Sequence, residues 1–114
     1  MADAELEYCY LTTTGRRTGR PHTIEIWFAL TGRRLYLLAG GGESSDWVRN
    51  LLADPTVKVR LGERERSGRA SRVLDPAEDE RARSLVHDKY VTRYSGDLRE
   101  WRRTALPVVV ELSD

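Results

Sequence analysis

The chain of 114 residues has a single cysteine, Cys9, and only two histidines, His22 and His87. One thiol excludes a disulfide framework, and two histidines are too few for a zinc-type cluster, so we expect no metal. The longest apolar run, residues 105–110, is far shorter than the about 20 residues of a membrane-spanning helix. No basic segment followed by an apolar one opens the chain. We therefore expect a cytoplasmic protein without a membrane span.

Lysine is scarce, and charges of the two signs are balanced. The net charge is +1, from 19 basic and 18 acidic residues, which gives no overall reason to bind nucleic acid. Only Lys58 and Lys89 are lysines, so the other 17 basic residues are arginines. Arginine is planar and donates hydrogen bonds in pairs, which suits phosphate and carboxylate groups. A cluster of arginines would therefore indicate where an anionic ligand binds.

Short strands separated by polar turns dominate the pattern. Apolar segments, several of them alternating, predict strands at residues 8–14, 22–30, 34–39, 57–61, 67–74 and 105–112, with a charged turn at 63–66. In 22–30 the apolar face carries Ile24, Ile26, Phe28 and Leu30. The connections have hairpin length, so we expect a mostly antiparallel sheet of about six strands that closes or nearly closes to protect its edges. Residues 1–114 thus form one mainly β (α+β) domain, a small β-barrel with peripheral helices.

Two helices are predicted beside the barrel. The first is short, ends at Asp54-Pro55, and has cap oxygens and an apolar face. The cap residues are Ser44, Ser45 and Asp46, and the face is Trp47, Val48, Leu51 and Leu52. The second begins at Asp75-Pro76, with a cap residue, a proline at the first helical position and Glu78 three residues after the cap, and runs to about residue 90. Its inward residues are Ala82, Leu85, Val86 and Tyr90. Residues 94–103 form a loop or a third short helix.

Residues 12–20 are the most informative segment. They combine hydroxyl groups with arginines and two glycines, in the order Thr12, Thr13, Thr14, Gly15, Arg16, Arg17, Thr18, Gly19 and Arg20. These residue types can form a cradle for phosphate or carboxylate. The same composition also fits a polar hairpin tip whose arginines lie in water. The segment matches neither the phosphate-binding P-loop nor the dinucleotide-binding fingerprint.

A second glycine cluster, residues 40–42, precedes the first helix. The start of that helix would add its positive dipole end, although the glycines could also be a plain connection. Trp27 could form an aromatic wall beside a binding site made by these two glycine-rich loops, or it could be an ordinary barrel residue. Cys9 lies in an apolar strand and is expected in the core. No nucleophile with a matching base is evident, so the reactive atoms of an enzyme of this sequence would belong to a cofactor.

The ordered series of motifs resembles the deazaflavin-dependent nitroreductase family over residues 11–112. The similar segments are 11–21, Ile26-Trp27-Phe28, 35–39 leading into the glycines, 47–51 with Asp54-Pro55, a Val-x-Val strand, and Trp101 with 107–110. The resemblance implies a split β-barrel and reduced coenzyme F420, a deazaflavin, as hydride donor. It also implies an electron-poor small-molecule acceptor such as a nitroaromatic, a quinone or an enone. The coenzyme carries a phosphodiester and a glutamate tail, so it is polyanionic.

The resemblance also implies roles for individual residues. The phosphate and tail would lie among Thr14, Gly15, Arg16, Arg17, Thr18 and Gly19. The strand residues Glu25, Ile26 and Trp27 would lie along the deazaflavin ring. The opposite wall would be formed by Ala39, Gly40, Gly41, Gly42, Trp47 and Asn50. The proton donor would be Tyr94 or solvent, and few other catalytic side chains are required.

Two other functions fit the same residues. A split barrel could instead bind FMN, often as a dimer, and exposed aromatic residues together with the resemblance favour a homodimer. A non-enzymatic barrel could bind a cofactor, or it could bind nucleic acid through residues 12–20, here called the arginine loop. The balanced charge, and aromatic residues that are not gathered on one strand face, argue against nucleic acid.

Overall fold

Seven antiparallel strands form one sheet in the order β2-β1-β5-β6-β7-β4-β3. The computed structural model describes residues 2–113. The strands are β1 Cys9–Thr14, β2 Pro21–Ile26, β3 Ala29–Thr31, β4 Arg34–Ala39, β5 Thr56–Leu61, β6 Arg64–Arg72 and β7 Leu106–Leu112. The helices are α1 Asp46–Ala53, α2 Pro76–Tyr90 and α3 Arg99–Thr104, with short 3-10 turns at Asp3–Glu5 and Gly42–Ser44. None of the helices within residues 2–113 is long and apolar enough to cross a membrane.

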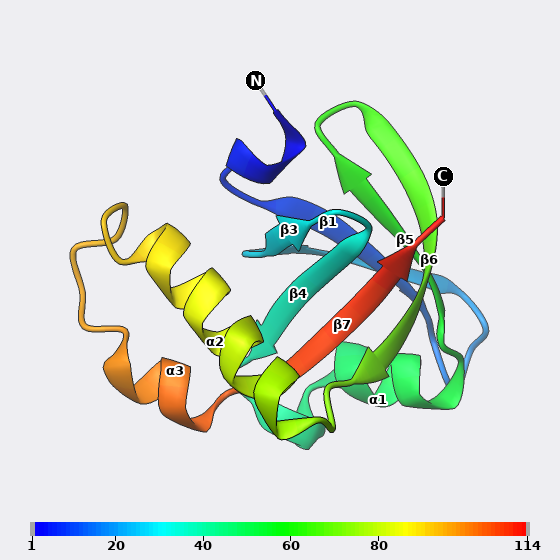
Figure 1. Cartoon of the computed structure of the whole chain (residues 1–114). Helices are drawn as coiled ribbons and strands as arrows, with labels where there is room; N and C mark the ends of the chain where they lie inside the picture. Colours follow the sequence, from blue (N-terminus) through cyan, green and yellow to red (C-terminus); the bar gives the residue numbers. More distant parts are fainter. Residues whose placement is uncertain (1, 114) are drawn as a thin grey trace.

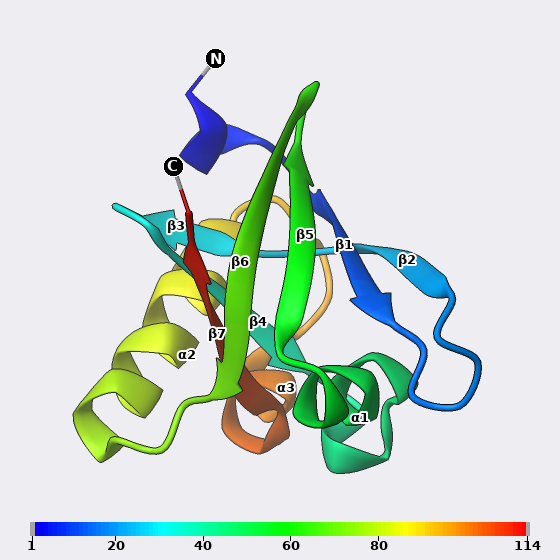
Figure 2. The same ribbon diagram turned by 90° about the vertical axis from the view of Figure 1, so that its right-hand side faces the viewer.

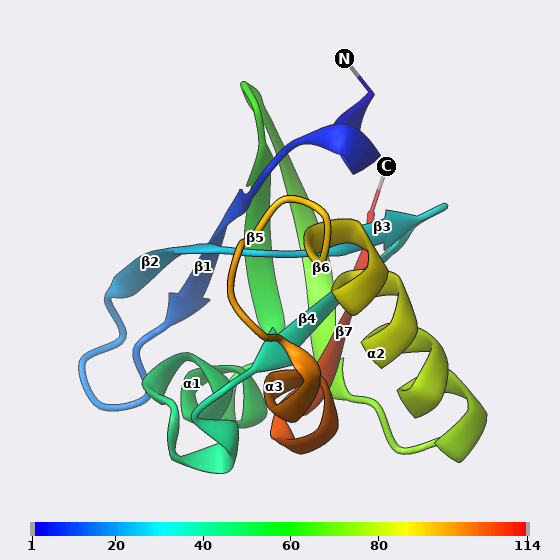
Figure 3. The same ribbon diagram turned by 90° about the vertical axis from the view of Figure 1, so that its left-hand side faces the viewer.

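The two edge strands of this sheet belong to one chain segment. β2 and β3 are separated by only Trp27 and Phe28, yet β2 pairs with β1 and β3 pairs with β4 at the opposite edge. The sheet must therefore curl until its edges approach, and Figures 2 and 3 show this segment crossing the curled sheet. The predicted barrel is confirmed as a split β-barrel, with seven strands instead of about six. The prediction of one strand over 22–30 is wrong, because the segment must leave one partner strand before it joins another.

Side-chain alternation survives this break and separates two cores. Ile26 and Phe28 pack with the residues enclosed by the sheet, such as Leu11, Val59 and Val110. The intervening Trp27 packs in a second cluster. That cluster contains Ala29, Tyr36, Val86, Tyr90 and Val109 and lies where α2 and α3 cover the outer face of β4 and β7 (Figure 1). A period of two along each strand thus directs alternate residues into different cores.

The β5–β6 hairpin is longer than predicted. We expected a turn at 63–66, but β6 begins at Arg64, opposite Leu61. Gly62 has φ 64°, a conformation that glycine adopts without strain, and this permits a turn of only two residues. The charged residues that follow lie in the ladder, where Lys58 on β5 forms an ion pair with Glu65. Their side chains reach solvent, so charge does not oppose strand formation there.

Both predicted helices are confirmed, but three residues, Ser45, Leu52 and Leu85, do not have the predicted roles. The carboxylate of Asp75 accepts the Glu78 N–H at 2.9 Å, as the capping signal predicts. Ser45 precedes α1 but makes no side-chain cap bond. Leu52 and Leu85 are exposed instead of facing the core, because each helix buries a narrower stripe than its apolar residues suggest. The ambiguous segment 94–103 contains most of α3.

Candidate functional site

A polar pocket of about 470 Å³ lies between the arginine loop, β2 and the start of α1. Figure 2 shows the loop that joins β1 to β2 beside α1. The lining residues carry hydroxyl, guanidinium, imidazole and amide groups, one carboxylate and two apolar side chains. They are Thr13, Gly15, Arg16, Arg17, Thr18, His22, Thr23, Ile24, Asp46, Trp47 and Asn50. These groups suit an anionic ligand.

Asn50 fixes the arginine loop to the barrel. Its side chain is buried on α1, and its Oδ1 accepts from the Arg16 backbone N–H at 3.2 Å and from Arg16 Nη1 at 2.9 Å. Its Nδ2 donates to the hydroxyl of Thr13 at 3.2 Å. Thr13 points inward with Cys9 and Leu11, so its buried hydroxyl needs a partner. One amide side chain thus connects α1, β1 and the loop.

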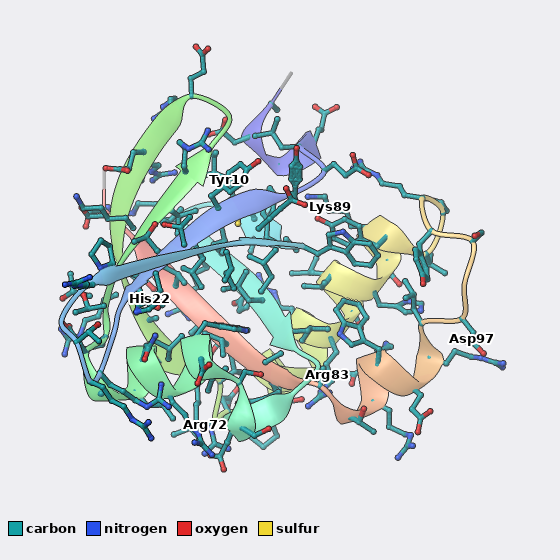
Figure 4. The ribbon with its side chains drawn as sticks, turned by 180° about the vertical axis from the view of Figure 1, so that it is seen from behind. Tyr10, His22, Arg72, Arg83, Lys89 and Asp97 are labelled. Atoms are coloured by element: carbon teal, nitrogen blue, oxygen red, sulfur yellow. The ribbon has the colours of Figure 1, made fainter. Side chains whose placement is uncertain are left out.

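The two glycines give the loop its shape. A Cβ on Gly15 would lie 2.6 Å from His22 Nε2 and 2.8 Å from Thr18 Oγ1, so no other residue fits without displacing them. Gly19 has φ 72° and donates its N–H to the Gly15 carbonyl at 2.8 Å. The Thr18 hydroxyl accepts the Arg20 N–H at 3.2 Å. The segment is therefore a specified turn. Figure 4 shows His22 near the start of β2, beside this turn.

The two adjacent arginines differ in their surroundings. Arg16 is bound to Asn50, and its Nη2 lies 3.3 Å from Asp46 Oδ1, which balances its charge. Arg17 is exposed, and within the described part of the chain its guanidinium has no side-chain or backbone partner. The α1 dipole also favours an anion at this end of the pocket, because Ser45 caps no N–H there. Arg17 is thus the cation that remains available to a ligand.

A second pocket of about 390 Å³ is mainly apolar and aromatic. Its lining is Glu25, Ile26, Trp27, Leu38, Tyr94, Leu98 and Trp101. The Trp27 ring stands almost perpendicular to those of Tyr94, at 5.5 Å, and Trp101, at 5.8 Å. Tyr94 is half exposed, and within residues 2–113 its hydroxyl has no hydrogen-bond partner. Such a pocket can take a flat ring and leave one hydroxyl free to donate a proton.

β2 lies between the two pockets. Ile24 lines the polar pocket, and the next two residues, Glu25 and Ile26, line the aromatic one. As an edge strand β2 pairs only with β1, so backbone groups along its other edge are available to a ligand. An elongated molecule with an anionic end and a flat end fits this arrangement. Among the described residues no group of three His, Cys, Asp or Glu side chains could hold a metal ion.

The structure brings together only part of the residue set expected from the sequence. Gly15, Arg16, Arg17, Thr18, Trp47 and Asn50 line the polar pocket, and Glu25, Ile26, Trp27 and Tyr94 line the aromatic one. The other six line neither pocket, namely Thr14, Gly19, Ala39, Gly40, Gly41 and Gly42. Gly40 lies against Trp101, because a Cβ there would be 3.5 Å from that ring. Gly40 therefore adjoins a residue of the aromatic pocket, whereas a Cβ on Gly41 would meet Ser45.

Several lining residues were not expected from the sequence. They are His22, Thr23, Ile24 and Asp46 in the polar pocket and Leu38, Leu98 and Trp101 in the aromatic one, while Thr13 was expected only as a member of the 12–20 segment. Alternation from Cys9 could have shown that Thr13 faces inward. Leu38, Leu98 and Trp101 come from three separate elements, and no local pattern relates them.

Comparison with known proteins agrees with this geometry. Residues 4–113 match the family model described as F420H(2)-dependent quinone reductase. The chain is 30% identical over 105 residues to F420H(2)-dependent quinone reductase Rv1261c of Mycobacterium tuberculosis, covering 88% of this chain and 69% of that protein.

Solved structures share the fold at lower identity. A structure titled F420-H2 Dependent Reductase (FDR-A) has a TM-score of 0.73 and 20% identity, covering 94% of both chains. The conserved hypothetical protein Rv2991 of Mycobacterium tuberculosis has a TM-score of 0.75 and 22% identity, covering 100% of this chain and 82% of that one. The resemblance to deazaflavin-dependent split-barrel oxidoreductases is thereby confirmed. The chain belongs to the F420H(2)-dependent quinone reductase family.

Proposed function

We propose that this protein is an oxidoreductase that uses reduced coenzyme F420 to reduce a quinone-type acceptor. The observation that carries the proposal is the pair of adjoining pockets, one basic and one aromatic, on either side of β2. The family that the chain belongs to is named for this donor and this acceptor. When bound, the reduced deazaflavin supplies a hydride, and the protein supplies position and a partly dry pocket.

The residues of the polar pocket fit a polyanionic ligand. The free guanidinium of Arg17 can bind phosphate or a tail carboxylate, and Thr18 adds a hydroxyl beside it. Arg16 and Asn50 keep the loop in place. The backbone of Glu25, Ile26 and Trp27 would lie along the ring, which leaves the Trp27 side chain to the aromatic pocket. The expected contacts of Thr14, Gly19 and residues 39–42 with the cofactor remain part of this proposal.

The aromatic pocket fits the acceptor. Trp27 and Trp101 offer flat apolar surfaces, and Leu38 and Leu98 exclude water from the inner side. A quinone that accepts a hydride also needs a proton on its oxygen, and the Tyr94 hydroxyl or solvent would provide it. Nitroaromatics and enones are likewise flat and electron-poor, so we propose them as further acceptors.

Binding measurements with matched variants test the proposal. Purified protein is titrated with F420 and separately with FMN, and fluorescence reports saturation. We expect saturable affinity for the deazaflavin and a Kd that rises roughly tenfold in Arg17→Ala, because a hydrogen bond to a charged group contributes about 1.5–3 kcal/mol. Arg20→Ala is the control, since Arg20 is an exposed arginine of the same loop outside the pocket.

The outcomes of this titration are distinct. No saturable affinity for F420 would refute the proposal, and tighter binding of FMN would favour the FMN-dependent alternative. A Kd for F420 that stays unchanged in Arg17→Ala, as in Arg20→Ala, would show that the loop is only a solvated turn. A steep loss of RNA or DNA affinity with salt, without F420 affinity, would favour the nucleic-acid alternative.

The oligomeric state and the cellular location are separate proposals. One similar solved chain, with 22% identity and a TM-score of 0.69, is titled a domain-swapped dimer. We propose a homodimer, which sedimentation would test, and a cytoplasmic location, which fractionation of the source cells would test.

A further inference from the structure

The chain leaves the sheet at Trp27 and Phe28, between β2 and β3. Phe28 is fully buried, yet it lies outside the registers that pair β2 with β1 and β3 with β4. A buried residue outside a ladder lacks ladder partners for its N–H and its C=O, and an unpaired buried group is costly. The break therefore depends on partners from elsewhere in the fold.

The last two residues of α2 supply these partners. The Phe28 N–H donates to the Tyr90 hydroxyl oxygen at 3.1 Å. The Tyr90 hydroxyl in turn lies within donating distance of two carbonyls, that of Glu7 at 2.6 Å and that of Phe28 at 3.2 Å. Lys89 Nζ donates to the Phe28 carbonyl at 3.0 Å and lies 3.6 Å from the centre of the Phe28 ring. Figure 4 shows Lys89 at the end of α2, beside the segment that joins β2 to β3. Both polar backbone groups of the break are thus satisfied by one helix end.

The same tyrosine holds the neighbouring tryptophan. The rings of Tyr90 and Trp27 are stacked, with centroids 4.2 Å apart and planes within 4° of each other. Tyr94 and Trp101 meet Trp27 at nearly perpendicular angles. Tyr90 therefore covers one face of Trp27 while its hydroxyl fixes the adjoining peptide group. The position of a main wall of the aromatic pocket is set from α2.

We infer that Lys89 and Tyr90 are positioning residues for the acceptor. Neither lines the aromatic pocket, so they act through Trp27 and not by contact with the acceptor. They stabilise the orientation in which Trp27 presents its surface to a flat, electron-poor molecule. This inference rests on the proposed function in one respect, that the aromatic pocket receives the acceptor.

Two tyrosine-to-phenylalanine variants distinguish a positioning role of Tyr90 from a general loss of stability. Tyr90→Phe keeps the stacked ring and removes the hydroxyl contacts with the Phe28 N–H, the Phe28 carbonyl and the Glu7 carbonyl. Tyr36→Phe is the matched control, because Tyr36 is also 1% exposed and its hydroxyl donates to Glu78 at 2.7 Å. Tyr36 lines neither of the two candidate pockets. With menadione as acceptor and reduced F420 as donor, we expect Tyr90→Phe to raise the KM for menadione about tenfold with kcat and cofactor Kd unchanged. Tyr36→Phe should leave all three unchanged.

The two lysines provide a second pair. Lys89→Met keeps the apolar stem and removes one of the two donors to the Phe28 carbonyl, while the Tyr90 hydroxyl remains. Lys58→Met is its control, because Lys58 is exposed on β5, which pairs with neither β2 nor β3. We expect a threefold or so rise in the menadione KM for Lys89→Met, since one of the bonds at the break is lost, and none for Lys58→Met. This pair also keeps the test decisive if Tyr90→Phe fails to fold.

A measurement without turnover completes the test. Near-ultraviolet circular dichroism of the cofactor-free protein reports the fixed geometry of its tryptophans. We expect the tryptophan band to weaken in Tyr90→Phe and to persist in Tyr36→Phe. Equal KM values, or equal spectra, for the two tyrosine variants would overturn the inference. A wild-type protein that fails to oxidise reduced F420, with the spectral difference intact, would refute the proposed function and leave the control of Trp27 by Tyr90 standing.

Discussion

Replacing Asn50 by alanine tests how the arginine loop is held. The substitution removes the two bonds that Asn50 accepts from Arg16 and the bond that it donates to Thr13. The Arg16 guanidinium can find water, because 22% of its side chain is exposed. The Thr13 hydroxyl is 1% exposed and the Arg16 N–H lies beside the same amide, so neither finds water easily.

The expected loss follows from these two groups. A buried donor or acceptor without a partner costs about 1–3 kcal/mol. Both groups adjoin the polar pocket, so each loss should fall in the lower part of this range, and Asn50→Ala should lower the free energy of unfolding by about 2–4 kcal/mol in total. For a domain of this size that corresponds to a fall in Tm of roughly 8–16 °C. The loop also loses its anchor, and we expect the Kd for F420 to rise about tenfold. Urea unfolding and fluorescence titration measure the two effects.

Two further variants make the reasoning refutable. Asn50→Asp keeps an acceptor for Arg16 and for the Thr13 hydroxyl, so stability should change little. Its negative charge in an anion pocket should nevertheless weaken F420 binding. Leu52→Ala, on the exposed side of the same helix, should change neither quantity. If Asn50→Ala unfolds at the same urea concentration as Leu52→Ala, or if Asn50→Asp binds F420 like the wild type, the assigned role of Asn50 is wrong.

Two further predictions concern stability. Burial raises the pKa of Cys9 to about 12. This shift stabilises the folded protein below the thiol's ordinary pKa, and the stabilisation is lost as pH rises. Burial, aided by Arg93, lowers the pKa of Lys89 to about 8, so its contribution instead grows as pH rises above 8. The two slopes oppose each other between about pH 9 and 10. Urea unfolding across this range should show stability falling more steeply in Lys89→Met and rising in Cys9→Ala; identical profiles would contradict this. Separately, Asp75→Ala should cost about 1 kcal/mol of unfolding free energy through its lost cap, whereas Ser45→Ala should cost little; equal losses would disprove the difference in capping.

The sequence predicts the strands and the first core well, because both depend on local alternation. Residues 57–61 alternate as apolar and charged, and the structure buries Val57, Val59 and Leu61. Asp75 and the proline after it mark the start of α2 to the residue. Such signals are contained in a few neighbouring side chains, so no knowledge of the rest of the fold is required.

The break at Trp27 and Phe28 could not be predicted in this way. The residues around it alternate as in an unbroken strand, and the break arises because β2 and β3 pair with different strands. The aromatic pocket has the same difficulty, since Leu38, Leu98 and Trp101 meet only in the folded barrel. Adjacent Arg16 and Arg17 are chemically alike in the sequence. Only the position of Asn50 makes one of them structural and leaves the other available to a ligand.

The two pockets are held by different helices, which has a consequence for how the protein works. α1 fixes the arginine loop through Asn50, and α2 fixes Trp27 of the aromatic pocket through Tyr90. The two residues contact different elements and share no partner, so their effects on unfolding free energy should add within about 0.5 kcal/mol in the double variant. Cofactor Kd should follow Asn50 alone, and acceptor KM should follow Tyr90 alone. Substitutions along α2 should therefore change which acceptor is reduced, while the affinity for reduced F420 stays the same.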